Sequence, residues 1–284
     1  MINLAQALAA ARAQHGEQAS YITLQTLLAY VVGKDRAWLL AHQDEVLTPG
    51  QTQLYMDLAQ RAAQGEPLAY ITGQKAFGLL SFDVEHGVLV PRPETESLVD
   101  LVVDWVHRQA ITTPQIVDVG TGSGVIAVSL AVRLAEAEVY ATDIAPEAVR
   151  ITRQNAAKHE VADRVHCLQG SLLDPVRGQF DVIAANLPYI DSDELRELVV
   201  TDWEPLVALD GGQQGVALIT RLLEQAPRQL KSPGLLILEM GYNQGQAVGA
   251  LCRAAFPTAH ITLHKDLAQL DRIMTVEIQP VVNL

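Results

Sequence analysis

The sequence predicts an α/β protein in which a doubly wound parallel sheet follows a small helical domain, and three observations support this fold class. From Gln115 onward, apolar runs of strand length alternate with segments of helical periodicity, a pattern typical of parallel sheets. The first 75 residues show helical periodicity only. The 49% hydrophobic content consists mostly of Leu, Val, Ile and Ala, as in strands that helices cover on both faces.

The first domain, residues 1–75, is expected to be a bundle of helices. Ser20 precedes a segment, 21–32, whose apolar side chains recur at helical spacing. Thr48 is a second cap, and Pro49 after it stands at the first helical position. These helices carry no cluster of catalytic side chains. We therefore expect them to serve substrate recognition or to act as a structural cap.

A β-hairpin linker is expected over residues 76–92, because the helical pattern breaks there and short extended runs follow. The runs turn around Ser81 and lie at 77–80, 82–85 and 88–90. Prolines in residues 91–93 stiffen the exit from this linker. A helix is then predicted over 94–106, with acidic residues in its first turn.

The remaining residues, 93–284, are expected to form the doubly wound domain. Strands are predicted at 116–119, 138–142, 164–169, 180–185 and 235–240. Helices are predicted between them at 125–134, 146–158 and 216–230. The tail adds a helix at 246–255 and strands at 259–263 and 272–278. Ligands of such folds bind beyond the carboxyl ends of the strands, so the residues at those ends are the candidates for function.

The charge of the chain weighs against nucleic acid as a direct partner. The net charge is −13, and residues 76–284 hold 15 Lys and Arg against 27 Asp and Glu. Nucleic-acid binding relies on basic side chains that displace counterions. No basic leader and no apolar run of membrane length opens the chain. We therefore expect a cytoplasmic protein without a membrane partner.

Neither the cysteines nor the histidines predict a metal site. Cys167 and Cys252 are too few and too far apart for a disulfide framework or a zinc site, so buried thiols are expected. His260 and His264 are four residues apart on a predicted strand that runs into a loop. Solvated side chains are expected there rather than metal ligands.

The first candidate site is a glycine loop, residues 118–124, which follows an apolar strand and opens a helix. Its motif is DVGTGSG, and its candidate ligand-binding residues are Gly120, Thr121, Gly122, Ser123 and Gly124. Glycines let the backbone approach a ligand closely, and the helix start offers free N–H groups. The G-x-G-x-G spacing differs from the dinucleotide fingerprint G-x-G-x-x-G, which disfavours a nicotinamide cofactor.

Asp143 stands at the end of the second predicted strand, where a carboxylate can accept hydrogen bonds from both hydroxyls of a ribose. Together with the glycine loop it favours a cofactor that contains adenosine. The residues that end the third strand, through Leu172, would then flank the adenine. Asp143 could instead cap the helix that begins at Pro146.

The decisive candidate site is Asn186-Leu187-Pro188-Tyr189, at the end of the fourth predicted strand. A carboxamide nitrogen is a poor nucleophile, because its lone pair is delocalised into the carbonyl. Acceptors that fix its NH2 group can aim the nitrogen at an electrophilic methyl group. The Asn186 side-chain oxygen and the backbone carbonyl that follows can serve as these acceptors, and Tyr189 supplies a flat wall. An ordinary turn after a strand is the alternative.

At this point the sequence resembles a known family. The glycine loop, Asp143 and the run 180–190 (FDVIAANLPYI) are similar to the motifs of class I amino-methyltransferases. Further motifs resemble the release-factor glutamine methyltransferases of the HemK type, namely 65–73 (GEPLAYITG), 91–96 (PRPETE), 204–212 (EPLVALDGG), 235–241 (LLILEMG) and 266–272 (DLAQLDR).

The resemblance implies a Rossmann-like class I methyltransferase domain behind a helical domain that helps to bind a release factor. The methyl donor would be S-adenosyl-L-methionine, with S-adenosyl-L-homocysteine as product. The acceptor would be the side-chain amide nitrogen, N5, of the glutamine in the Gly-Gly-Gln motif of class 1 peptide-chain release factors. By position, the cofactor would contact Gly120 to Gly124, Asp143, Leu172 and Asn186, and residues 186–189 would hold the glutamine.

Two residues depart from the family pattern. Leu187 replaces the first proline of the usual N-P-P-Y motif, and Leu172 stands where some members carry an aromatic residue against adenine. An adenine N6-methyltransferase acting on nucleic acid is the nearest alternative function, because that chemistry uses the same kind of site. A nicotinamide oxidoreductase and a non-catalytic adenosylmethionine-binding module are more distant alternatives.

Overall fold

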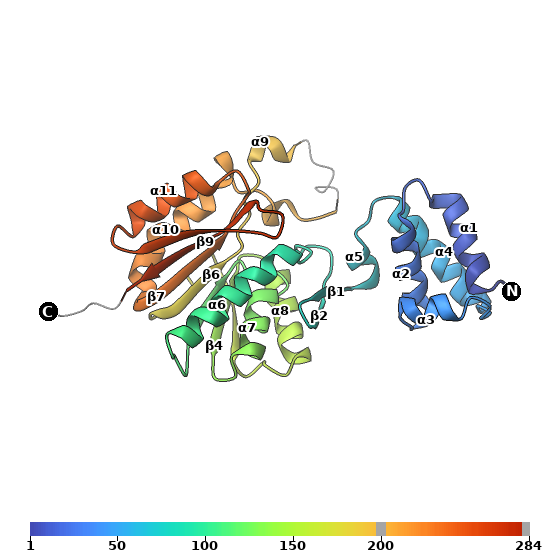
Figure 1. The fold of residues 1–284 in the computed structure, drawn as a ribbon, viewed down its shortest axis with the longest axis horizontal. Coiled ribbons are helices and arrows are strands. Elements are labelled where there is room, and N and C mark those ends of the chain that lie inside the picture. Colours follow the sequence, from blue (N-terminus) through green and yellow to red (C-terminus); the bar gives the residue numbers. More distant parts are fainter. Residues whose placement is uncertain (197–202, 280–284) are drawn as a thin grey trace. The chain divides into compact units, whose positions relative to one another are not determined.

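The computed structural model describes residues 1–196 and 203–279 (Figure 1). The chain forms two compact units, Met1–Gln74 and Lys75–Leu284. The first unit ends beside the border predicted at residue 75. The hairpin expected as a separate linker over 76–92 belongs to the second unit.

The first unit is helical, as the sequence predicts. Its helices are α1 (Leu4–His15), α2 (Tyr21–Val32), α3 (Arg36–Ala41), α4 (Pro49–Ala63) and α5 (Leu68–Thr72). The Ser20 side chain caps α2 by accepting a hydrogen bond from the backbone N–H of Thr23. Thr48 caps α4 in a reciprocal arrangement with Gln51, and Pro49 follows it. The helices enclose a core of buried aliphatic side chains and Tyr55.

The second unit begins with a short hairpin whose register differs from the prediction. Its strands are β1 (Gln74–Phe77) and β2 (Leu80–Asp83). Ser81 lies inside β2 and residues 88–90 form no strand, so the predicted turn around Ser81 and the predicted strand at 88–90 are both wrong. The turn lies at Gly78, where a φ of +55° suits the first position of a two-residue loop. This register buries Phe77 and Phe82, whose rings meet edge to face at 6.0 Å.

A seven-stranded sheet forms the centre of the second unit, in the order β5-β4-β3-β6-β7-β9-β8. Its strands are β3 (Gln115–Val119), β4 (Glu138–Asp143), β5 (Val165–Gln169), β6 (Phe180–Ala185), β7 (Leu230–Glu239), β8 (His260–Lys265) and β9 (Asp271–Ile278). The strands from β3 to β7 pair in parallel, whereas β9 pairs antiparallel with both β7 and β8. The mixed, Rossmann-like sheet agrees with the predicted fold class.

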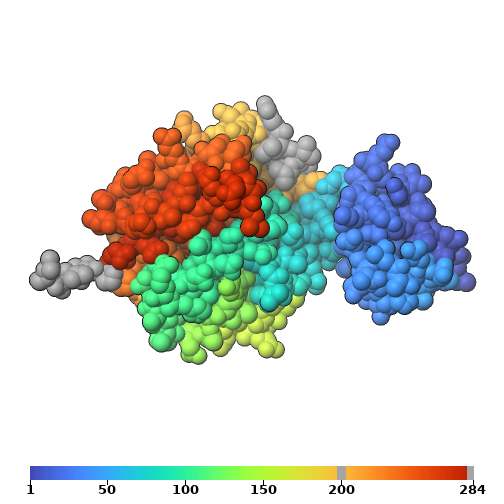
Figure 2. Space-filling model, in the orientation of Figure 1, coloured from blue at the N-terminus to red at the C-terminus, as the bar shows by residue number. Residues whose placement is uncertain are grey.

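Helices cover both faces of this sheet (Figure 1). They are α6 (Glu96–Arg108), α7 (Val125–Arg133), α8 (Pro146–Lys158), α10 (Ala217–Gln229) and α11 (Gly245–Ala255). Shorter turns are η1 (Pro93–Thr95), α9 (Ser192–Leu195), η3 (Leu206–Ala208) and η4 (Gln213–Gly215). In the space-filling view, the green segment with α6 lies directly beside the orange and red segment with β7 and β9 (Figure 2).

Two separate cores follow from the alternation of side chains along the strands. Ile116 and Val182 face the core shared with α6, α7 and α8. Their neighbours Val117 and Ile183 face the core shared with α10 and α11. Both cysteines are buried free thiols, as expected. Within residues 1–196 and 203–279, no helix is long and apolar enough to cross a membrane.

The strand order reverses at β3, which pairs with β4 on one side and with β6 on the other. Connections from neighbouring strands leave in opposite directions at such a point, and a crevice opens beyond their carboxyl ends. The glycine loop follows β3, and Asn186 follows β6. The topology therefore brings the two motifs of the sequence to one crevice.

Candidate active site

The glycine loop is held in place by the buried carboxylate of Asp118 at the end of β3. Its Oδ2 accepts hydrogen bonds from Thr121 Oγ1 at 2.7 Å and from the backbone N–H of Ala127 at 3.1 Å. Burial raises the pKa of Asp118 to about 7, although these two hydrogen bonds lower it. Gly120 and Gly122 have φ angles of +75° and +57°, which disfavour any other residue. The loop is thus fixed in a shape that only glycine adopts readily.

A cavity of about 360 Å³ lies over this loop. It is lined from the glycine loop, from the ends of β4, β5 and β6, and from the segment before η1. The predicted site residues that line it are Gly120, Thr121, Gly122, Ser123, Asp143, Leu172, Asn186, Leu187 and Pro188. As far as the chain is described, the lining does not include Gly124 or Tyr189.

Asp143 lies at the carboxyl end of β4 and joins the lining to the glycine loop. Its Oδ2 accepts from the backbone N–H of Gly122 at 2.9 Å, and its Oδ1 accepts from that of Ala145 at 2.9 Å. Burial raises the pKa of Asp143, while these hydrogen bonds oppose the rise. In the described chain, the N-cap of α8 is Ala145 and makes no side-chain capping bond, so the helix-capping alternative for Asp143 is wrong.

Leu172 lines the cavity from the loop after β5. Its backbone has a φ of +49°, an uncommon conformation for a residue with a Cβ. A hydrogen bond of 2.9 Å from Thr142 Oγ1 to the Leu172 carbonyl holds it there. The side chain is 7% exposed, so the aliphatic surface predicted beside the adenine forms part of a packed wall.

The 186–189 segment leaves β6 toward the same cavity. Leu187 is buried, and a Cβ added to Gly120 would come within 2.9 Å of its Cδ2 atom. The leucine that replaces the family's proline therefore packs directly on the glycine loop. The Tyr189 carbonyl accepts a hydrogen bond of 2.8 Å from Gln244 Nε2. Burial raises the pKa of the Tyr189 hydroxyl, and its predicted contact with substrate stays a prediction.

Gly124 lies behind the cavity, at the N-cap of α7. Its φ is +82°, and an added Cβ would meet the Thr152 side chain at 2.8 Å. Gly124 therefore allows α7 and α8 to approach closely. Its predicted contact with a cofactor stays a prediction.

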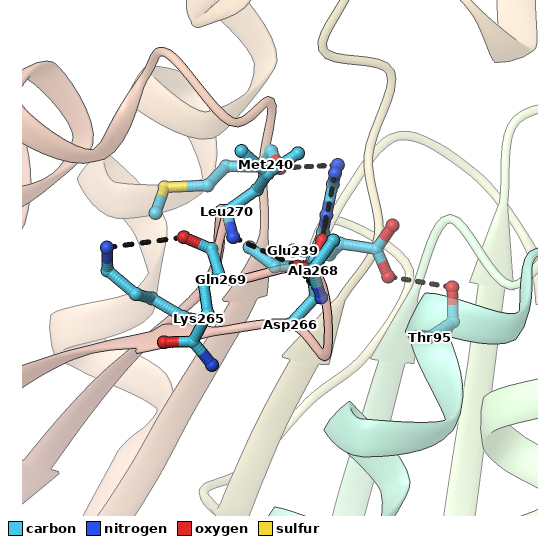
Figure 3. Close-up of polar contacts among 9 residues, drawn as sticks. Thr95, Glu239, Met240, Lys265, Asp266, Ala268, Gln269 and Leu270 are labelled. Atoms are coloured by element: carbon cyan, nitrogen blue, oxygen red, sulfur yellow. Dashed lines mark hydrogen bonds and ion pairs between the residues drawn. The ribbon is translucent and has the colours of Figure 1, made fainter.

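Two residues beside Asn186 were not identified from the sequence, namely Thr95 in η1 and Glu239 at the end of β7. Thr95 Oγ1 donates to Glu239 Oε2 at 2.7 Å (Figure 3). Asn186 Nδ2 in turn donates to Thr95 Oγ1 at 3.0 Å. Thr95 and Glu239 are each 1% exposed. A single carboxylate in the apolar run 235–240 was the signal available in the sequence.

Arg92 is a further cavity residue that sequence reasoning did not assign. Its guanidinium donates to Glu204 Oε1 at 2.6 Å, and the Glu204 side chain is buried. Both residues come from motifs that carry the family resemblance, PRPETE and EPLVALDGG. The ion pair ties the entry segment of the second unit to the segment after residue 203.

Side chains that could bind a metal ion do not cluster in residues 1–196 and 203–279. Within those ranges, no three His, Cys, Asp or Glu side chains gather closely enough to hold a metal ion. The prediction of solvated side chains is confirmed for His260, which is exposed, and only in part for His264, which is half-buried. Both His260 and His264 lie on β8, where His264 Nε2 is 2.9 Å from Thr275 Oγ1. Burial lowers the pKa of His264.

Comparisons with known proteins find matches to segments of both units. A family described as "PrmC N-terminal domain" matches residues 4–73, and one described as "Ribosomal protein L11 methyltransferase (PrmA)" matches residues 97–201. Among solved structures, the chain is similar to a Thermus thermophilus 16S rRNA N2 G1207 methyltransferase in complex with AdoMet and guanosine. That likeness has a TM-score of 0.52 and 14% identity over 72% of this chain and 50% of the other, and it shows the fold alone.

Curated relatives extend the likeness over nearly the whole chain. A release factor glutamine methyltransferase of Yersinia pestis is 39% identical over 94% of this chain and 95% of its own length. The enzyme of the same name from Moorella thermoacetica is 40% identical over 90% of this chain and 91% of its own length. At this identity and coverage, the chain belongs to the release factor glutamine methyltransferase family.

Proposed function

We propose that this protein transfers a methyl group from S-adenosyl-L-methionine to the N5 nitrogen of the glutamine in the Gly-Gly-Gln motif of class 1 peptide-chain release factors. S-adenosyl-L-homocysteine is the second product. The family relationship supports this reaction. The observation on which the proposal depends is that Asn186 and the glycine loop line the same cavity.

The described residues fit an adenosine-bearing methyl donor. The glycine loop leaves room at Gly122, where an added Cβ would meet only a Val88 methyl group at 3.9 Å. The Asp143 carboxylate accepts from the backbone N–H groups of Gly122 and Ala145, and its two oxygens have further lone pairs to offer to a ribose hydroxyl. Leu172 offers an apolar wall for a base. When bound, S-adenosylmethionine supplies a methyl group made electrophilic by a sulfonium.

Asn186 can orient the acceptor amide. Its Nδ2 donates to Thr95, which leaves the Oδ1 atom to accept from the NH2 group of a substrate glutamine. The Leu187 backbone carbonyl is the second acceptor in this proposal. The glutamine nitrogen forms a bond to the methyl carbon as the sulfur–carbon bond breaks, and the nitrogen then loses one proton to water. Held acceptors aim the nitrogen lone pair, and this positioning is the main catalytic contribution of the chain.

The first unit is proposed as a recognition domain for the release factor. It contains no part of the cavity described above, and a family named for this N-terminal domain matches residues 4–73. Because release factors act at ribosomes in the cytoplasm, the proposal assigns the protein to translation termination in that compartment. The excess of acidic residues in the second unit argues against nucleic acid as the alternative substrate.

Mass spectrometry of a class 1 release factor incubated with the protein and methyl-labelled S-adenosylmethionine tests this function. One methyl group is expected on the glutamine of the Gly-Gly-Gln motif, and none on a release factor with alanine at that position. Asn186→Ala serves as the matched enzyme control. Label on another residue, or on nucleic acid and not on the release factor, would overturn the proposal.

A further inference from the structure

We infer that Thr95 and Glu239 are positioning residues that fix which end of the Asn186 carboxamide faces the substrate. The inference rests on the proposed function. It assigns a role to two residues that lie outside both the glycine loop and the 186–189 motif. It concerns three side chains from three separate elements, namely η1, the end of β6 and the end of β7.

A carboxamide presents an acceptor oxygen at one end and a donor NH2 group at the other. Only the orientation with Oδ1 toward the cavity can accept a hydrogen bond from a substrate amide. A rotation of half a turn about the last side-chain bond would present a second NH2 group to the substrate NH2. Two donors would then face each other, and the glutamine nitrogen would lose its alignment. Something must therefore distinguish the two ends of Asn186.

The direction of the hydrogen-bond chain makes this distinction. Glu239 is buried, and its ionised carboxylate can only accept. Thr95 Oγ1 lies 2.7 Å from Glu239 Oε2, so the single hydroxyl hydrogen of Thr95 is committed to that oxygen. Toward Asn186, 3.0 Å away, the hydroxyl can offer only a lone pair. A donor must occupy the facing end of Asn186, which is Nδ2, and Oδ1 is left for the cavity.

Protonation of Glu239 would remove the fixed donor-to-acceptor direction of this hydrogen-bond chain. A neutral carboxyl can donate to Thr95, and the Thr95 hydroxyl would then be free to donate to a reversed Asn186. Burial raises the pKa of Glu239 to about 7, opposed chiefly by the hydrogen bond from Thr95 and by the charge of Arg272. The charged and titratable groups that act on it are Arg272 on β9, Glu94 in η1 and the nearby Tyr189 hydroxyl.

Polar contacts connect the end of β7, next to Glu239, with the β8–β9 hairpin (Figure 3). The next residue, Met240, accepts a hydrogen bond of 3.4 Å from Arg272 through its carbonyl. Arg272 also pairs with Asp266 at the tip of the β8–β9 hairpin at 3.4 Å. The Asp266 carboxylate accepts from the backbone N–H groups of Ala268 and Leu270. The end of β7 is therefore braced by the antiparallel part of the sheet.

The test compares Thr95→Val, which keeps the shape and removes the hydroxyl, with Thr95→Ser, which keeps the hydroxyl. Single-turnover methyl transfer at about pH 8 should fall tenfold or more in Thr95→Val, the equivalent of about 1.4 kcal/mol. It should stay within about threefold of wild type in Thr95→Ser. Equal losses in both variants, or a fully active Thr95→Val, would overturn the inference.

The pH profile gives a second readout. The wild-type rate should fall as the pH decreases through about 7, because Glu239 becomes neutral there. Glu239→Gln should be slower at about pH 8 and should lack this acid limb, since its side chain does not titrate. A Glu239→Gln profile with the same acid limb as wild type would contradict the role of this carboxylate.

A third readout does not depend on activity. Hydrogen exchange of the 15N-labelled Asn186 side-chain amide, assigned by its loss in Asn186→Ala, should be slow in wild type and Thr95→Ser and fast in Thr95→Val. Unchanged exchange in Thr95→Val would count against the inference. An inactive wild type with the expected exchange pattern would overturn the proposed function and leave the orientation of Asn186 supported.

Discussion

Asp143→Ala is expected to weaken binding of S-adenosylhomocysteine through two separable effects. The first is loss of the carboxylate that would accept from the ribose hydroxyls. The second is loosening of the cavity wall, because the backbone N–H groups of Gly122 and Ala145 lose their acceptors at 2.9 Å. The two effects lower the affinity for different sets of ligands. Only the first depends on the hydroxyls of the ligand.

The magnitude follows from the kind of contact. A hydrogen bond to a charged carboxylate contributes about 1.5–3 kcal/mol, which corresponds to roughly 10- to 150-fold in affinity. The ribose effect of Asp143→Ala should have at least this size. The loosening of the loop adds a further loss, which any ligand of the cavity would suffer equally.

Titration calorimetry with two ligands separates these effects. Wild type and Asp143→Ala are each titrated with S-adenosylhomocysteine and with its 2′,3′-dideoxyribose analogue, after circular dichroism shows that the variant is folded. The variant should lose roughly 10- to 150-fold more affinity for the first ligand than for the second. Equal losses for both ligands would mean that Asp143 only shapes the loop. Unchanged affinity for both would refute its assignment to the cofactor site.

Three further predictions concern the acceptor site, the first unit and stability. Asn186→Ala should lower single-turnover transfer by orders of magnitude, whereas Leu187→Pro keeps the backbone carbonyl and should change it less than about tenfold. A wild type that becomes active only with Leu187→Pro would refute this. A chain beginning at Lys75 should, if folded, bind S-adenosylhomocysteine normally yet methylate the release factor poorly; full activity without the first unit would exclude the recognition role. Burial raises the pKa of Asp118 from 3.8 to about 7, so its contribution to stability is present below about pH 4 and is lost as the pH rises through about 7. Urea unfolding should therefore show a steeper decline between about pH 4 and pH 7 in wild type than in Asp118→Asn, and parallel curves would contradict this reasoning.

The sequence alone determined the features that depend on neighbouring residues. Helical spacing behind Ser20 predicted α2 with its observed bounds, because capping and periodicity are local properties. The sequence also predicted that the glycine loop and the 186–189 segment follow strands, because the apolar runs before them are local features as well. Parallel strands bring their carboxyl ends to one edge, so both motifs could be expected beside one crevice.

The tertiary structure decided the contacts that join distant segments. Thr95 lies 91 residues from Asn186 and 144 residues from Glu239. No periodicity links them, because their meeting depends on the strand order and on where η1 packs. The register of the β1–β2 hairpin was likewise set by burial of Phe77 and Phe82 in the core of the second unit. Local rules specify each element, whereas strand order and packing specify which side chains meet, and these depend on the whole chain at once.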